Sequence, residues 1–142
     1  RIHCPWDGEI IHSNHLGSSL YSVNKRAQES IPRLYIKNER SILHIVSNSL
    51  EYALVSVGAS IVGSIVPFWI NNKECSRKEL VEEWKIGPPE DTKVKKGDEL
   101  AHFRMGSTVI LIFKDSYKID LDSLKENKLV KFGNKLISLK NI

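Results

Sequence analysis

Short runs of β-branched and aromatic residues recur along this chain at even spacing, with turn-forming residues between them. This alternation is typical of an all-β sandwich or barrel. We expect turns at Asp7-Gly8, Asn48-Ser49, Gly58, Asn71-Asn72 and Lys96-Gly97-Asp98. The expected strands are residues 9–12, 19–23, 34–37, 41–46, 52–57, 62–67, 100–103 and 108–113.

Only two stretches favour a helix. Residues 78–84 combine good helix formers with Leu80, Val81 and Trp84 on one side, after the candidate cap Ser76. Residues 122–127 form a second short candidate, and residues 85–96, with their glycine and prolines, are expected to form a loop. The predicted fold class is therefore mainly β, with one or two short helices.

The uncharged stretch from residue 53 to residue 70 is at the lower limit of what could span a bilayer. Glycine, serine and proline interrupt it, and valine and isoleucine are enriched between them. This composition favours strands over a helix. We therefore predict two buried strands joined near residues 58–60.

Length and charge set broad limits. A chain of 142 residues is long enough for one domain with its own core. The formal net charge of +4 suits an anionic membrane surface or nucleic acid equally well. Two cysteines make no disulfide framework. The chain starts at Arg1, inside a motif and without an initiating methionine or leader, so we expect it to be a fragment of a longer protein.

Met105-Gly106-Ser107-Thr108 lies between the expected turn at 96–98 and the apolar run that follows it. Glycine and serine together usually mark only a turn. Here other motifs accompany them in a set order, and together they resemble the phosphatidylserine decarboxylase family over residues 1 to about 113. These motifs are His3-Cys4-Pro5-Trp6-Asp7-Gly8, Leu20-Tyr21-Ser22-Val23-Asn24, Ile31-Pro32-Arg33-Leu34, Asn38-Glu39-Arg40, residues 57–65 and residues 96–100.

The resemblance implies that the chain cuts itself between Gly106 and Ser107. The Ser107 hydroxyl would attack the Gly106 carbonyl, and the serine would end as a pyruvoyl group, the cofactor of a decarboxylase. Residues 1–106 would then belong to the β chain and residues 107–142 to the α chain. His3 matches the family histidine that serves as base for this step, a role that suits a group titrating near neutral pH. The family's aspartate partner and its first histidine would lie before Arg1.

Other residues leave alternatives open. The glycine-rich residues 57–65 are either buried strands or the lining of a pocket formed by Gly58, Ala59 and Gly63. Asn38-Glu39-Arg40 is either a turn with a salt-bridging pair or an organiser of the site. His3, Cys4, His12 and His15 match no zinc spacing, so no metal site is predicted.

The turns at Asp7-Gly8 and Gly97-Asp98 also resemble those of the barrel-sandwich domains that carry biotin or lipoate. The hairpin lysine of a carrier is absent, so this resemblance supports a barrel-sandwich-like fold and not that function.

Taken together, the resemblance implies the zymogen of a lyase in phospholipid biosynthesis, which converts phosphatidylserine to phosphatidylethanolamine and CO2. The alternative is a non-catalytic lipid- or partner-binding domain on the same fold. The expected partners are phosphatidylserine, a membrane surface, the two cleaved chains, the missing N-terminal segment and a second copy in a homodimer, with no nucleic acid. The expected location is a mitochondrial or other inner membrane, or an endomembrane.

Overall fold

The structure, a computed structural model, describes residues 1–17, 19–60, 65–69, 91–104, 108–114, 119–120 and 126–140. In this part of the chain, strands dominate and two short helices accompany them. The elements are β1 (Ile2–His3), β2 (Gly8–Leu16), α1 (Lys25–Ser30), α2 (Leu34–Lys37), β3 (Arg40–Val46), β4 (Glu51–Val57), β5 (Ile65–Pro67), β6 (Lys93–Val94), β7 (Glu99–Phe103), β8 (Thr108–Phe113), β9 (Ile119–Asp120) and β10 (Ser138–Leu139).

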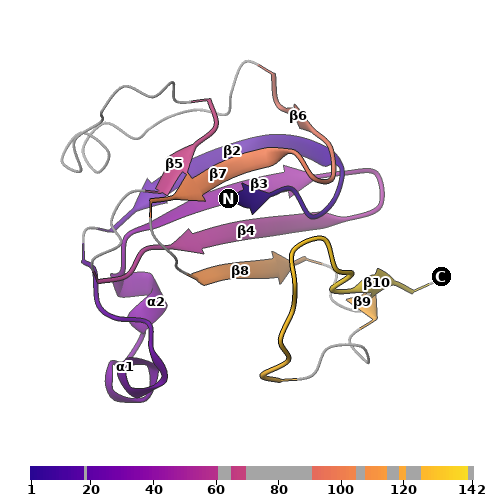
Figure 1. The fold of residues 1–142 in the computed structure, drawn as a ribbon. Coiled ribbons are helices and arrows are strands. Elements are labelled where there is room, and N and C mark those ends of the chain that lie inside the picture. The colour runs from indigo at the N-terminus through magenta and orange to yellow at the C-terminus, as the bar shows by residue number, and fades with distance from the viewer. Residues whose placement is uncertain are drawn as a thin grey trace.

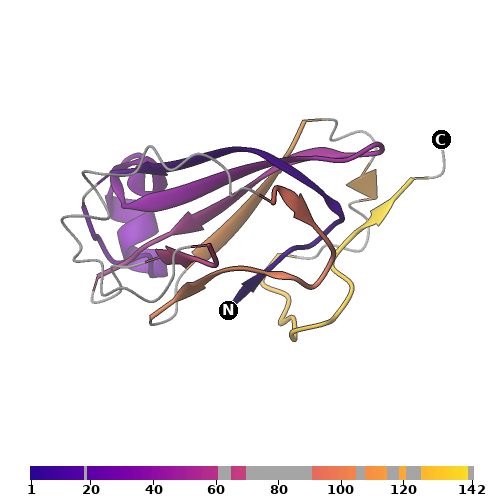
Figure 2. The ribbon, with the colours of Figure 1, turned by 90° about the horizontal axis from the view of Figure 1, so that it is seen from above.

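The strands form two main sheets and one small one. The larger sheet has five strands in the order β6-β2-β3-β4-β8, and the second has three in the order β1-β7-β5. Every described strand pair is antiparallel. Figures 1 and 2 show the three-stranded sheet lying against one face of the larger sheet, with α1 and α2 at one end and the small β9-β10 sheet at the other. The mainly β prediction is confirmed.

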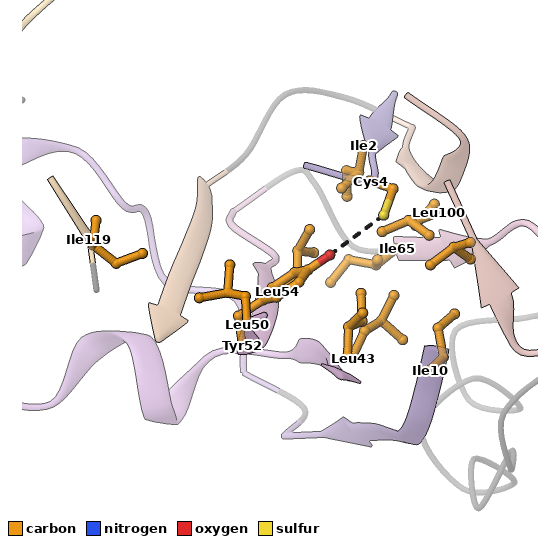
Figure 3. Close-up of a cluster of buried hydrophobic side chains, with 13 residues drawn as sticks. Ile2, Cys4, Ile10, Leu43, Leu50, Tyr52, Leu54, Ile65, Leu100 and Ile119 are labelled. Carbon is orange, nitrogen blue, oxygen red and sulfur yellow. Dashed lines mark hydrogen bonds between the residues drawn. The ribbon is translucent and has the colours of Figure 1, made fainter. Parts of the chain in front are cut away.

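Alternation of side chains explains how the larger sheet packs. On β3, Ser41, Leu43 and Ile45 are buried while the residues between them are partly exposed, as the two-residue period of a strand requires. Side chains from both sheets meet in one core, which Figure 3 shows as sticks. It contains Ile2, Ile65 and Leu100 from the smaller sheet and Ile10, Leu43, Ile45, Tyr52 and Leu54 from the larger one.

The two turns at Asp7-Gly8 and Gly97-Asp98 contact each other. Cys4 N–H donates to the Asp98 carbonyl at 2.8 Å, and Gly97 N–H donates to the Cys4 carbonyl at 2.8 Å. The Asp7 carboxylate accepts from Lys96 N–H at 2.7 Å. Gly97 has φ +96°, a left-handed conformation that favours glycine. These contacts fix the start of the three-stranded sheet against the larger sheet.

A polar contact lies inside the core beside these turns. The Tyr52 hydroxyl donates to the Trp6 carbonyl at 2.8 Å, and the Cys4 thiol donates to the same carbonyl at 3.0 Å. The sulfur and the hydroxyl are 3.5 Å apart, the contact dashed in Figure 3. Burial raises the pKa of Tyr52 and of Cys4, so both groups stay protonated at neutral pH.

Two local predictions are wrong. Residues 34–37 form the single turn α2 and not a strand, because Arg33 has φ 59° and Asn38 N–H closes the turn onto the Leu34 carbonyl. Within residues 19–23 only Ser19 makes a bridge, to Asn38, and no strand forms. Helix α1, which Asn24 caps by accepting from Ala27 N–H, was not predicted from the sequence.

Of the other expected elements, some are confirmed and some lie outside the described residues. The strands expected at 9–12, 41–46, 52–57, 100–103 and 108–113 are present, and β2 continues to Leu16. Residues 65–67 of the expected 62–67 strand form β5, in the other sheet from β4. The helix expected at 78–84 and most of that at 122–127 lie outside the described residues. Within the described residues, no helix has the length and apolar character needed to cross a membrane.

Candidate active site

The predicted cleavage residues, Gly106 and Ser107, lie outside the described residues, but both flanking strands are described. β7 ends at Phe103 in the three-stranded sheet, and β8 begins at Thr108 in the larger sheet. The Gly-Ser pair therefore belongs to the connection between the two sheets. In Figure 1, β7 ends and β8 begins on the same side of the molecule, near α2.

A row of paired residues crosses the larger sheet at the start of β8. Leu16 pairs with Arg40, Arg40 pairs with Val57, and Val57 pairs with Thr108. The end of β2, the start of β3 and the end of β4 therefore lie beside the residue that follows Ser107. The residues just beyond this row are therefore close in the chain or in the sheet to the segment that follows the predicted cleavage residues.

Asn38 ties three segments together at this end of the sheet. Its side-chain oxygen accepts from Tyr21 N–H at 2.9 Å, and its amide nitrogen donates to the Tyr21 carbonyl at 2.8 Å and to the Gly58 carbonyl at 2.9 Å. The residue has no exposed surface. Gly58 N–H in turn donates to the Glu39 carbonyl at 2.8 Å. Gly58 is thus held through both of its main-chain polar groups.

Glu39 is paired with His15, a contact that was not predicted from the sequence. His15 Nε2 lies 3.2 Å from Glu39 Oε1, and the two side chains are 1% and 0% exposed. The Arg40 guanidinium donates to the carbonyls of Ile36 and Asn38. Glu39 thus forms an ion pair with a residue of β2, and the role of Asn38-Glu39-Arg40 as an organiser of the site stays a prediction.

His3 lies in β1, opposite Glu99 at the start of β7. Its ring contacts that of Phe132, with centroids 4.6 Å apart. Phe103 is four residues further along β7, about 13 Å at the usual rise of a strand. Because β1 and β7 are antiparallel, the chain on the N-terminal side of His3 runs towards Phe103, the end of β7 that precedes the predicted cleavage residues in the sequence. The assignment of His3 as base stays a prediction.

The acids around His3 are engaged elsewhere. Glu99 forms an ion pair with Arg1 at 3.0 Å and lies 3.7 Å from His102. Asp7 and Asp98 accept main-chain N–H groups in the two turns. The expectation that the triad aspartate belongs to another segment stays a prediction.

The predicted pocket residues are only partly described. Ala59 is buried, 6% exposed, beside the doubly held Gly58, whereas Gly63 lies outside the described residues. A surface hollow lined in part by Phe68, Lys93 and Glu99 lies at the β6-β7 turn, away from Gly58. Among the described residues, no three acidic, histidine or cysteine side chains gather as metal ligands would.

Fold and site together define a class: a mainly β domain of two packed sheets with a Gly-Ser pair in the connection between them. The chain belongs to the phosphatidylserine decarboxylase family, because the sequence model of that family matches residues 1–138. No solved structure matches it.

Several bacterial relatives, each named phosphatidylserine decarboxylase proenzyme, are similar to this chain. That of Methylobacillus flagellatus is 32% identical over 119 residues, which is 84% of this chain and 42% of the relative. That of Nitrosospira multiformis is 32% identical over 136 residues, or 94% of this chain and 47% of the relative. That of Coxiella burnetii is 37% identical over 114 residues, or 80% and 39%. The chain thus spans less than half the length of these relatives.

Proposed function

We propose that this chain is the catalytic part of a phosphatidylserine decarboxylase that makes its pyruvoyl group by cleavage between Gly106 and Ser107. Family membership and the place of the Gly-Ser pair, directly before Thr108 of β8, carry the proposal. Residues 1–106 and 107–142 are then the parts of two chains that derive from one.

The cleavage chemistry follows from the residues themselves. A base removes the Ser107 hydroxyl proton, the oxygen attacks the Gly106 carbonyl, and the peptide bond is replaced by an ester while the proton passes to the Ser107 nitrogen. Loss of the Ser107 Cα proton breaks the Cβ–O bond, which releases the Gly106 carboxylate and leaves dehydroalanine. Water then replaces the nitrogen, which leaves as ammonia, and the new chain starts with a pyruvoyl group.

The described residues fit such a group. A pyruvoyl group would be attached to the Thr108 nitrogen, and Thr108 is anchored in the sheet by its pairing with Val57. The new chain end would therefore stay in place after cleavage. When formed, the group supplies the electron sink for loss of CO2 from the substrate. Asn38 and Glu39, through Gly58, hold the strand end beside it.

Intact-mass spectrometry of the full-length protein tests this function. We expect two chains that separate between Gly106 and Ser107, with the smaller one beginning in a pyruvoyl group. Ser107→Ala should give one uncleaved chain without decarboxylase activity, because it lacks the attacking oxygen. A single unbroken wild-type chain that still binds lipid would support the non-catalytic alternative. Normal two-chain product from Ser107→Ala would contradict the proposal.

A membrane surface is the proposed location, because the substrate is a lipid. The exposed segment 128–136 supports this proposal. Leu129 and Phe132 are 86% and 82% exposed, and lysines stand at 128, 131 and 135. A turn closed by Asn134 N–H on the Lys131 carbonyl holds Phe132 at its tip. Each lysine near an anionic leaflet is worth roughly 1 kcal/mol, and exposed apolar side chains favour lipid over nucleic acid.

Vesicle sedimentation tests the membrane contact. We expect the full-length protein to bind vesicles of phosphatidylserine and phosphatidylcholine more tightly than phosphatidylcholine alone. Leu129→Ser should weaken that binding several-fold, since the side chain would leave the acyl boundary. Phe132 is kept in this variant because its ring contacts His3. Ile36→Ser, at an apolar residue of α2 that is 50% exposed, is the matched control and should change little. Equal losses in both variants would argue against this segment.

A further inference from the structure

The buried His15–Glu39 pair has no part in the cleavage chemistry described above. Its two side chains are 1% and 0% exposed, and His15 Nε2 lies 3.2 Å from Glu39 Oε1. Both side chains are shielded from solvent, and within the described residues each lies within ion-pair distance of the other. A carboxylate in such a place without its partner would cost several kcal/mol. The pair therefore acts as a unit that fixes both side chains.

Its position connects it to the cleavage bond. His15 pairs with Ser41 across β2 and β3, and Glu39 precedes Ser41 by two residues. The Glu39 main chain accepts from Gly58 N–H at 2.8 Å and donates to the Ser19 carbonyl at 2.8 Å. Gly58 follows Val57, the partner of Thr108. Two contacts thus connect Glu39 with Thr108: the hydrogen bond from Gly58 to Glu39 and the pairing of Val57 with Thr108.

We propose that the His15–Glu39 pair is a positioning unit for the processing reaction. The close contact between the two buried side chains fixes Glu39, the Glu39 carbonyl holds Gly58, and the pairing of the neighbouring Val57 holds Thr108, one residue beyond the proposed cleavage bond. This role rests on the proposed self-cleavage. It is distinct from the base, because neither side chain is required to touch the reacting atoms.

A second histidine–glutamate pair in the same sheet supplies a control. His44 Nε2 lies 3.0 Å from Glu51 Oε1, with side chains 32% and 26% exposed. This pair joins β3 to β4, whereas the first joins β2 to the residue before β3. The second pair lies near the opposite end of β4 from Val57. Both pairs join a histidine to a glutamate, but they differ in burial and in connection to Thr108. Glu51 also accepts a hydrogen bond from Lys114, at the far end of β8 from Thr108.

Stability and positioning can be separated by replacing the whole pair. A buried ion pair exchanged for apolar residues of similar size often leaves stability unchanged or higher, whereas removal of one partner destabilises. The double variant His15→Leu with Glu39→Leu should therefore remain folded. If the pair serves only stability, this variant should cleave normally.

The test is the first-order rate of cleavage of the full-length protein, followed by intact mass after synthesis, with folding checked by circular dichroism. We expect the double leucine variant to cleave about tenfold more slowly or worse, since small misplacements of reacting groups cost up to about a hundredfold. His15→Gln, which retains a donor towards Glu39, should recover most of the rate. The control His44→Leu with Glu51→Leu should cleave within about twofold of wild type.

Three results would overturn the inference: a folded double variant that cleaves at the wild-type rate, a control pair that slows cleavage equally, or no recovery in His15→Gln relative to the double leucine variant. A wild-type protein that never cleaves would instead contradict the proposed function. The two failures are thus told apart by the wild-type measurement.

Discussion

Asn38 offers a sharp test of what holds the candidate site together. Its side chain makes three hydrogen bonds, to Tyr21 N–H, the Tyr21 carbonyl and the Gly58 carbonyl, in a fully buried position. At about 1 kcal/mol for each bond, Asn38→Ala should lower the free energy of unfolding by about 3 kcal/mol. For a domain of this size, such a loss of unfolding free energy corresponds to a fall in Tm of roughly 10 °C.

Asn38→Asp makes the same test without a change of size. An oxygen replaces the nitrogen that donates to the two carbonyls, so an ionised carboxylate at position 38 would face two acceptors. The pKa of the introduced carboxyl group in the folded protein should therefore lie above its unfolded value of roughly 3.9. The protonated form can donate one bond again, so this variant should be least stable at neutral pH and regain stability relative to wild type as the pH falls.

Thermal unfolding of the full-length variants between pH 4 and pH 8 measures both effects. Asn24→Ala is the control, because Asn24 loses only the cap bond to Ala27 N–H, at an exposed helix start, which costs about 1 kcal/mol. The role of Asn38 would be refuted if Asn38→Ala destabilised no more than Asn24→Ala, or if Asn38→Asp followed the wild-type pH dependence throughout.

Two further predictions concern groups outside the site. Tyr52→Phe should cost only about 1 kcal/mol in urea denaturation, because the Trp6 carbonyl keeps the Cys4 thiol as a donor; a loss several times larger would contradict this account. The hydrogen bond from Lys114, aided by His44, holds the pKa of Glu51 below its usual 4.5, so its stabilising effect is present above that pH and lost as the pH falls further. Glu51→Gln should therefore reduce the loss of stability in acid, measured by thermal unfolding from pH 6 to pH 3, and an unchanged acid slope would count against it.

Strand periodicity predicted the larger sheet well and the short elements poorly. On β3 the alternation of buried and partly exposed residues is long enough to carry a signal. Residues 34–37 are four mostly apolar residues without a period, so the φ of Arg33 and the bond from Asn38 N–H decide their conformation. Helix α1 buries no side chain, so it has no apolar stripe, and only its cap Asn24 was there to be recognised.

Some residues of the candidate site were predicted from the sequence, and others were found only in the structure. Ser107, Gly106 and His3 were predicted from motifs, which local sequence can carry. The His15–Glu39 pair joins residues far apart in the chain, and only the register of β2 on β3 brings them together. A histidine on a strand gave no sign of its partner, although the Asn38-Glu39-Arg40 motif did mark one half of the pair.

The fold also predicts that the two chains stay together after cleavage. The break would sever the connection from β7 to β8, yet β8 stays paired with β4 along its whole length, from Thr108 opposite Val57 to Phe113 opposite Tyr52. Ile119, 1% exposed, adds a buried side chain from the same chain to the core. Each such side chain contributes roughly 1.5–3 kcal/mol, so the smaller chain should remain bound without a covalent link.

Size-exclusion chromatography of the cleaved protein tests this retention. We expect both chains to co-elute in native buffer and to separate only under denaturing conditions. Ile119→Asp would place a charge in the core and should weaken retention of the smaller chain, whereas Ile112→Asp, on a side chain 56% exposed, should not. Because the pyruvoyl group would stand at the start of the smaller chain, decarboxylase activity should follow its retention. Loss of the smaller chain from the wild-type protein in native buffer would show that the paired strand and its core contacts are too weak to hold it.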